Sequence, residues 1–200
     1  MNEFKRRTSG VNRKCFDKHI ATIEKSGRDI SNLMDWIEAT DFLSAPASQK
    51  HHANYSGGLL EHSLNVAQLL STLTEQNKLI WETETSPLFV GLFHDVCKIG
   101  CYEMEYRNKK DPETGQWTQV PYYSFNAVDP LGHGEKSVIH LLQLTSMTDE
   151  EIYAIRYHQG LGVCPDYNRN YYNACRRFQN IIWTHAADNL AAVCEPSEPF

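Results

Sequence analysis

Histidine and aspartate recur along this chain inside segments that are otherwise apolar. The residues that carry this pattern most clearly are His62, His94, Asp95 and Asp188. His94 and Asp95 lie together in the middle of the apolar segment 88–99. An unpaired carboxylate buried there would cost several kcal/mol, so a cation has to compensate it. That cation is either the nearby Lys98 or a bound metal ion.

Any one of these histidines is more often a satisfied core or surface residue than a ligand. That explanation weakens when several apolar helices each offer a histidine or an aspartate, and His133 and His158 follow downstream. Neutral imidazole together with carboxylate suits divalent ions such as Mn, Fe, Co, Ni and Zn. The pattern therefore predicts a metal site for one of these ions, with Mg as a further candidate.

Helical periodicity predicts most of the elements that must position these residues. The expected helices cover 13–25, about 31–37, 58–76, 88–98, 134–144, 152–158 and about 178–190. Pro87 suits the first turn of its helix. Thr148 and Glu151 have the spacing of a capping box. The segment 160–171 has no such pattern, and we expect a loop there.

The segment from Tyr102 to Phe125 departs from the helical pattern because its residues alternate and a turn follows at 111–115. We expect a β-hairpin at about 101–125. Its aromatic residues, interleaved with cations such as Arg107, suit stacking on a nucleobase. On this interpretation the hairpin forms one wall of a substrate pocket. The alternative is an ordinary hairpin whose rings pack on the helices, and the residues leave both interpretations open.

Composition fits a soluble globular protein. The chain has 200 residues, 41% hydrophobic and 22% charged, and no apolar run approaches the roughly 20 residues of a membrane span. The net charge of −6 argues against a broad nucleic-acid footprint, although residues 1–28 carry eight Lys or Arg against three acids. We expect a cytoplasmic protein whose six cysteines are free thiols.

Two extended motifs resemble those of the HD superfamily of metal-dependent phosphohydrolases. The first is Gly57-Gly58-Leu59-Leu60-Glu61-His62-Ser63, and the second is Phe93-His94-Asp95-Val96-Cys97-Lys98-Ile99-Gly100. With Asp188 they reproduce the order H…HD…D of that superfamily. The resemblance covers about residues 50–192. It implies an all-α HD-domain bundle with the hairpin inserted, in which N-terminal helices of 1–50 pack on an HD domain of 51–200 as a single compact domain.

The resemblance also implies roles for individual residues. One metal would be held by His62, His94, Asp95 and Asp188. Asp95 would bridge to a second metal completed by His133 and His158, and Asp95 and Lys98 would be the catalytic residues. Lys98 would neutralise phosphate charge, unless it only forms a salt bridge to Asp95. Weaker candidates for substrate contacts are His52, Arg107, Lys136 and Arg156.

The function implied is hydrolysis of a phosphoester of a nucleotide or nucleotide-like substrate. The motif around His51-His52-Ala53 and Gly57–His62 is similar to the HD domain of bacterial 3′-to-5′ exoribonucleases, which also carry an OB-fold. This chain has too few residues before His51 for an OB-fold. A small exonuclease acting on short single-stranded nucleic acid is therefore an alternative. A non-catalytic nucleotide-binding sensor and an HD-type oxygenase are others.

Overall fold

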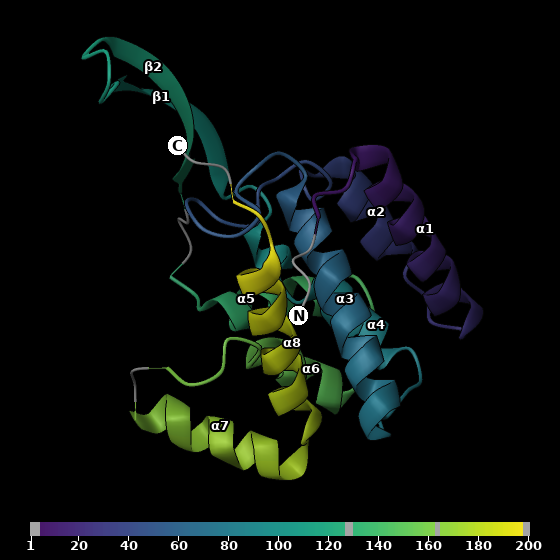
Figure 1. Cartoon of the computed structure of the whole chain (residues 1–200). Coiled ribbons are helices and arrows are strands. Elements are labelled where there is room, and N and C mark those ends of the chain that lie inside the picture. Colours follow the sequence, from purple (N-terminus) through teal and green to yellow (C-terminus); the bar gives the residue numbers. More distant parts are fainter. Residues whose placement is uncertain (1–4, 127–129, 163–164, 198–200) are drawn as a thin grey trace.

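The computed structural model describes residues 5–126, 130–162 and 165–197, and over these ranges the chain is mostly helical with a small two-stranded sheet (Figure 1). The helices are α1 (Ser9–Lys25), α2 (Ser31–Ala39), α3 (Gly58–Asn77), α4 (Ser86–Phe93), the 3₁₀ helix η1 (Val96–Lys98), α5 (His133–Leu142), α6 (Asp149–Arg156), α7 (Pro165–Arg177) and α8 (Asn180–Cys194). The strands are β1 (Tyr102–Lys110) and β2 (Trp117–Phe125). The predicted combination of a helical bundle and an inserted hairpin is confirmed.

Helix α3 lies at the centre of the bundle and packs against α4 and α8, while α6 packs against α5 and α8. The first half of α3 is buried on nearly every side, because its leucines face the core, His62 faces the other histidines and Glu61 accepts hydrogen bonds from Arg7 and Asn12. Helix α1 joins this core through Phe16, which contacts the rings of Phe42 and Phe93. One hydrophobic cluster thus connects the N-terminal helices with α3, α4 and α8.

Close packing of α3 on α4 depends on Gly91. A β-carbon at this position would lie 2.4 Å from the Cα atom of Ala67, which is far inside van der Waals contact. The absence of a side chain at Gly91 therefore lets the two helices approach. The same approach brings the rings of His62 and His94 to a centroid distance of 5.3 Å.

Two predictions of secondary structure were wrong. The helix expected at 88–98 ends at Phe93, and the backbone leaves the α-helical region at Asp95 before η1 begins. The loop expected at 160–171 instead contains the start of α7. Pro165 at the beginning, Asp166 in the first turn and Arg176 with Arg177 in the last turn all favour a helix there. The helix has few aliphatic residues, and its buried side is formed by Tyr171, Ala174 and Cys175, which the search for an apolar stripe did not reveal.

Other local predictions hold. The Thr148 hydroxyl accepts a hydrogen bond from the backbone N–H of Glu151, and the Glu151 carboxylate accepts one from the N–H of Thr148, which confirms the capping box. Helix α1 begins four residues before the predicted start at residue 13. The thiols at positions 15, 97, 101, 175 and 194 are free, while Cys164 lies outside the described residues.

Strands β1 and β2 pair antiparallel in continuous register from Tyr102 opposite Phe125 to Lys110 opposite Trp117. In Figure 1 the hairpin extends away from the helices, at the opposite end of the molecule from α7. Only its base lies against the body. Among the described residues, no helix combines the length and the apolar character that crossing a bilayer requires.

Candidate metal centre

Four elements that are distant in sequence bring their polar residues to one buried point. Helix α3 supplies His62, the junction of α4 and η1 supplies His94 and Asp95, and the end of α6 and helix α8 supply His158 and Asp188. The three imidazoles and Asp95 are at least 98% buried, whereas the Asp188 side chain keeps 18% of its surface exposed. The structure therefore assembles five of the six predicted ligands, with Asp188 on the side open to solvent.

Hydrogen bonds at the outer edge of the cluster fix the orientation of the three imidazoles. The Nδ1 atoms of His94 and His158 each contact the backbone carbonyl oxygen three residues earlier, at 2.9 and 2.7 Å. Nδ1 of His62 contacts a carboxylate oxygen of Glu195 at 3.0 Å. Carbonyl and carboxylate oxygens accept, so each Nδ1 donates a proton outward. All three Nε2 atoms therefore face the centre of the cluster, where a proton or a metal ion can bind.

The inner atoms lie at distances that suit shared coordination. His62 Nε2 is 3.1 Å from Asp188 Oδ1, and His94 Nε2 is 3.4 Å from Asp95 Oδ2. Ligand atoms about 2.0–2.2 Å from one ion are separated from each other by about 3–3.5 Å. Nε2 of both histidines and Oδ1 of Asp95 are buried and make no hydrogen bond. Because such buried atoms are costly without a partner, these atoms could hold a metal ion.

The electrostatic field of the cluster attracts cations. Burial lowers the pKa of His62, but the carboxylates of Glu195 and Asp188 outweigh that effect and raise its pKa to about 10. Burial likewise opposes protonation of His94, yet Asp95 and Asp188 raise its pKa to about 9. The pKa of Asp95 lies well below its usual value because the neighbouring Lys98 and His94 outweigh burial. A field that draws protons onto buried imidazoles also favours a divalent ion.

The two oxygens of Asp95 face different groups. Oδ2 faces His62 and His94, whereas Oδ1 lies 3.4 Å from Nε2 of His158. A second group of potential ligand atoms, from Asp95, Cys97 and His133, lies within 4.8 Å of one another. His133 is the first residue of α5, and its Nδ1 contacts the Cys97 sulfur at 3.3 Å. Burial raises the pKa of Cys97 to about 12, so its thiol stays protonated near neutral pH.

Lys98 is buried and its Nζ lies 2.6 Å from Oδ2 of Asp95. The break in the helix at Asp95 places Lys98 in η1, three residues further along. The salt bridge that was one alternative for this residue is thus present. It holds the amino group at the edge of the cluster, in direct contact with the potential ligand Asp95.

The four predicted substrate contacts are spread over different surroundings. The ring of His52 lies 4.8 Å from that of His62, and burial lowers its pKa to about 4. Arg156 forms a salt bridge with Glu135 and lines a pocket that also contains His133. Nζ of Lys136 lies 3.8 Å from the sulfur of Cys101.

Arg107 is separate from this group. It lies on β1, on the exposed part of the hairpin, where its guanidinium covers the ring of Tyr122 at 5.2 Å. The structure therefore places His52 beside the cluster and Arg156 in a neighbouring pocket, and it places Arg107 outside both.

Glu195 is the residue of this site that the sequence did not reveal. It follows α8, is 8% exposed, and accepts hydrogen bonds from His62 and from the side-chain amide of Asn65. Asn65 in turn accepts a hydrogen bond from Arg7. Residues near both ends of the described chain thus support the His62 imidazole of the cluster. No local motif marks Glu195, because its partners lie 130 and 133 residues away.

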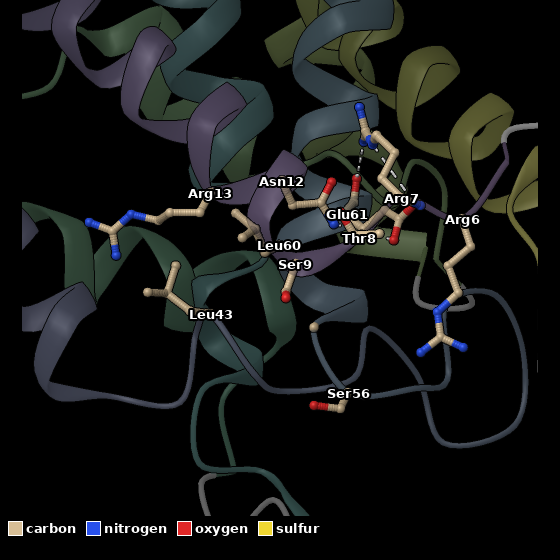
Figure 2. Close-up of a pocket in the computed structure, with 11 residues that line it drawn as sticks. Arg6, Arg7, Thr8, Ser9, Asn12, Arg13, Leu43, Ser56, Leu60 and Glu61 are labelled. Carbon is tan, nitrogen blue, oxygen red and sulfur yellow. Dashed lines mark hydrogen bonds and ion pairs between the residues drawn. The ribbon is translucent and has the colours of Figure 1, made fainter.

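A pocket of about 590 Å³ lies beside the first turn of α1 and does not reach the cluster (Figure 2). It contains three of the arginines that give the N-terminal segment its positive charge. Figure 2 shows Arg7 bonded to Glu61, while Arg6 and Arg13 extend away from each other. Arg13 pairs with Asp17 and Glu38. These arginines are therefore occupied by protein groups.

Comparison with known proteins returned no match among protein-family models, curated proteins or solved structures. The arrangement of the described residues is thus the basis for any functional conclusion. It consists of a buried cluster of histidine and aspartate, compatible with an HD-type site, that could hold a metal ion.

Proposed function

We propose that this protein is an HD-type metal-dependent phosphohydrolase that cleaves a phosphoester of a nucleotide or nucleotide-like substrate. The observation that carries the proposal is the orientation of three buried imidazoles, each of which donates its Nδ1–H outward and aims Nε2 at two aspartates. Such outward hydrogen bonds are the usual support of metal-bound histidines. A salt-bridged core would not need three ring nitrogens directed to one point.

His62, His94, Asp95 and Asp188 would hold one ion, and Asp95 with His133 and His158 a second. An ion in such a site supplies a nucleophile from water at neutral pH and stabilises negative charge on a phosphate oxygen. The partly exposed Asp188 marks the side from which a substrate can approach. The second group of potential ligand atoms, from Asp95, Cys97 and His133, supports two ions, from the set Mn, Fe, Co, Ni or Zn, or Mg.

Lys98 would act from the chain itself. Its amino group is held against Asp95, where it balances the charge of that carboxylate at the edge of the proposed metal site. A fixed positive charge at that place would favour a phosphate that gains negative charge during reaction. Proton transfer by Lys98 is not needed for this role.

A screen with added metals tests the proposal. Nucleotides, cyclic dinucleotides and a small aryl phosphodiester should be incubated with Mn²⁺, Co²⁺, Ni²⁺, Zn²⁺ or Mg²⁺, with phosphate or phosphomonoester release as the readout. Hydrolysis of at least one substrate should disappear in His94→Ala and persist in the control His19→Ala, since His19 lies on α1 outside the cluster. Metal binding without hydrolysis would favour a nucleotide sensor, and oxygen uptake by an iron-loaded sample would favour an oxygenase.

A further inference from the structure

The hairpin has two faces of different chemistry. Residues directly opposite each other in an antiparallel pair share a face, and the face alternates along each strand. The register therefore assigns to one face, here called the aromatic face, residues Tyr102, Met104, Tyr106, Asn108, Lys110, Trp117, Gln119, Pro121, Tyr123 and Phe125. The opposite or polar face contains Glu103, Glu105, Arg107, Lys109, Thr118, Val120, Tyr122 and Ser124.

The aromatic face is largely open to solvent beyond its base. Trp117 and Tyr106 keep 67% and 66% of their surface exposed, while Tyr123 near the base is buried. Met104, at 49%, and Phe125, at 40%, are exposed on the same face, and large apolar side chains that gather on one exposed face mark an interaction site. On the polar face, by contrast, the ring of Tyr122 is engaged by a hydrogen bond to Glu105 and by the guanidinium of Arg107.

Charge is divided between the two faces. The aromatic face contains no carboxylate in a protein whose net charge is −6, and its ionic residue is Lys110, opposite Trp117. The two glutamates of β1 lie on the polar face, together with the cations Arg107 and Lys109. Asn108 and Gln119 add amide groups to the aromatic face. A face that presents aromatic rings, side-chain amides and one amine but no carboxylate suits a ligand that contains both nucleobases and phosphates.

The aromatic face begins at the candidate metal centre. At its base the ring of Phe125 stacks on that of His133, with centroids 6.4 Å apart and planes 19° apart. A ligand atom of His133 lies within 4.8 Å of one on Asp95. From this point each nine-residue strand extends about 30 Å outward, at about 3.4 Å per residue. That length exceeds what a mononucleotide can cover.

We propose that the aromatic face binds a single strand of nucleic acid and leads its end to the metal centre. This inference rests on the proposed phosphoesterase function and names its substrate as an oligonucleotide. The bases stack on Trp117, Tyr106 and the rings nearer the base, and Lys110 contacts a phosphate. Stacking on an open face tolerates any base.

The test measures strand binding apart from cleavage. Fluorescein-labelled oligothymidine and oligouridine of about 12 nucleotides, both with phosphorothioate linkages, are titrated with the metal-loaded full chain by fluorescence anisotropy. Trp117→Ala and Tyr106→Ala should each weaken binding about 5- to 150-fold, the usual effect of losing one stacked ring. Tyr122→Ala is the matched control, because it removes a ring of the same hairpin from the polar face and should leave affinity within about twofold.

The outcomes separate this proposal from its alternatives. Equal weakening by Tyr122→Ala, or no weakening by either aromatic-face variant, would overturn it. A parent chain that is dimeric by light scattering and becomes monomeric in Trp117→Ala would assign the face to a second copy of the chain, which also overturns it. Hydrolysis of the small aryl phosphodiester should be equal in all three variants. If strands bind as expected but no phosphoester is cleaved, the proposed function fails while the binding face stands.

Discussion

The buried histidine cluster and the hairpin depart from ordinary protein surfaces and cores in opposite directions. The cluster places imidazoles and carboxylates where apolar side chains normally lie, and the hairpin exposes aromatic rings where polar side chains normally lie. The cluster is supported by four helices and by hydrogen bonds from distant residues. The outer hairpin is supported by contacts between its own two strands. Substitutions should therefore affect stability and metal binding strongly in the cluster and weakly in the hairpin.

The largest effect is expected from His94→Ala combined with Asp95→Ala. This variant should lose its metal, measured by elemental analysis after purification in Mn²⁺ or Zn²⁺. It should also lose about 3–5 kcal/mol of unfolding free energy, because the buried Lys98 is left unpaired. Adding Lys98→Met should restore most of that stability without restoring metal. Unchanged metal content in the double variant would refute the cluster as a metal site.

Removing the metal should produce the next largest effect. At a metal concentration about 100 times its Kd, binding contributes about 2.7 kcal/mol to stability. At about 2–4 °C per kcal/mol for a chain of this size, a chelator should lower the Tm by about 5–10 °C in scanning calorimetry. The double variant at positions 94 and 95 is the control, and it should show no shift. An equal shift in both proteins would mean that the chelator acts elsewhere.

Glu195→Ala should have an intermediate effect, since Glu195 orients His62 without being one of the inner ligands. Loss of such a supporting hydrogen bond usually lowers metal affinity about 10- to 100-fold. Glu195→Gln keeps an oxygen that can accept from Nδ1–H and should retain more affinity than Glu195→Ala. Competition with a chromogenic chelator measures both, with Glu38→Ala as a control in an exposed ion pair. Parental affinity in Glu195→Ala would show that His62 needs no support.

The smallest effect on the fold is expected from trimming the hairpin. Replacing Arg107 to Gln119 with a short Gly-Ser turn removes residues that are mostly exposed and lie outside the cluster. Metal content should stay unchanged, and the unfolding free energy in urea should change by less than about 1 kcal/mol. Loss of metal or of cooperative unfolding would show that the hairpin supports the centre, and the contrast between the two regions would disappear.

Local patterns in the sequence were enough to predict the hairpin and most helices. The apolar surroundings of His62 and of His94 with Asp95 also indicated buried polar residues, and the structure brings these residues together. The break after Phe93 was missed because the apolar pattern continues through Ile99, while the backbone turns so that consecutive polar residues can both face inward. Helix α7 was missed because its buried stripe is made of Tyr171, Ala174 and Cys175 rather than of aliphatic residues.

Glu195 was missed for a different reason. A hydrogen bond between residues 133 positions apart has no signature in any short window of sequence. The hydrogen bonds that link Arg7 to Asn65 and Asn65 to Glu195 have no such signature either. Motifs identify residues that act through their neighbours in sequence, whereas supporting residues become visible only when the helices are packed.

The separation of His62 and Glu195 also bears on the order of events during folding. The entropy lost on closing a loop grows with its length, so a contact across 133 residues forms only once enough other contacts offset that loss. A metal site built on a contiguous loop can bind its ion in an isolated peptide. Here the proposed site is complete only when α3 and the segment after α8 have already met. The time course of metal binding would therefore report when α3 and the segment after α8 come into contact during folding. Fragments produced by a cut anywhere between His62 and Glu195 would bind the ion weakly unless they reassociate.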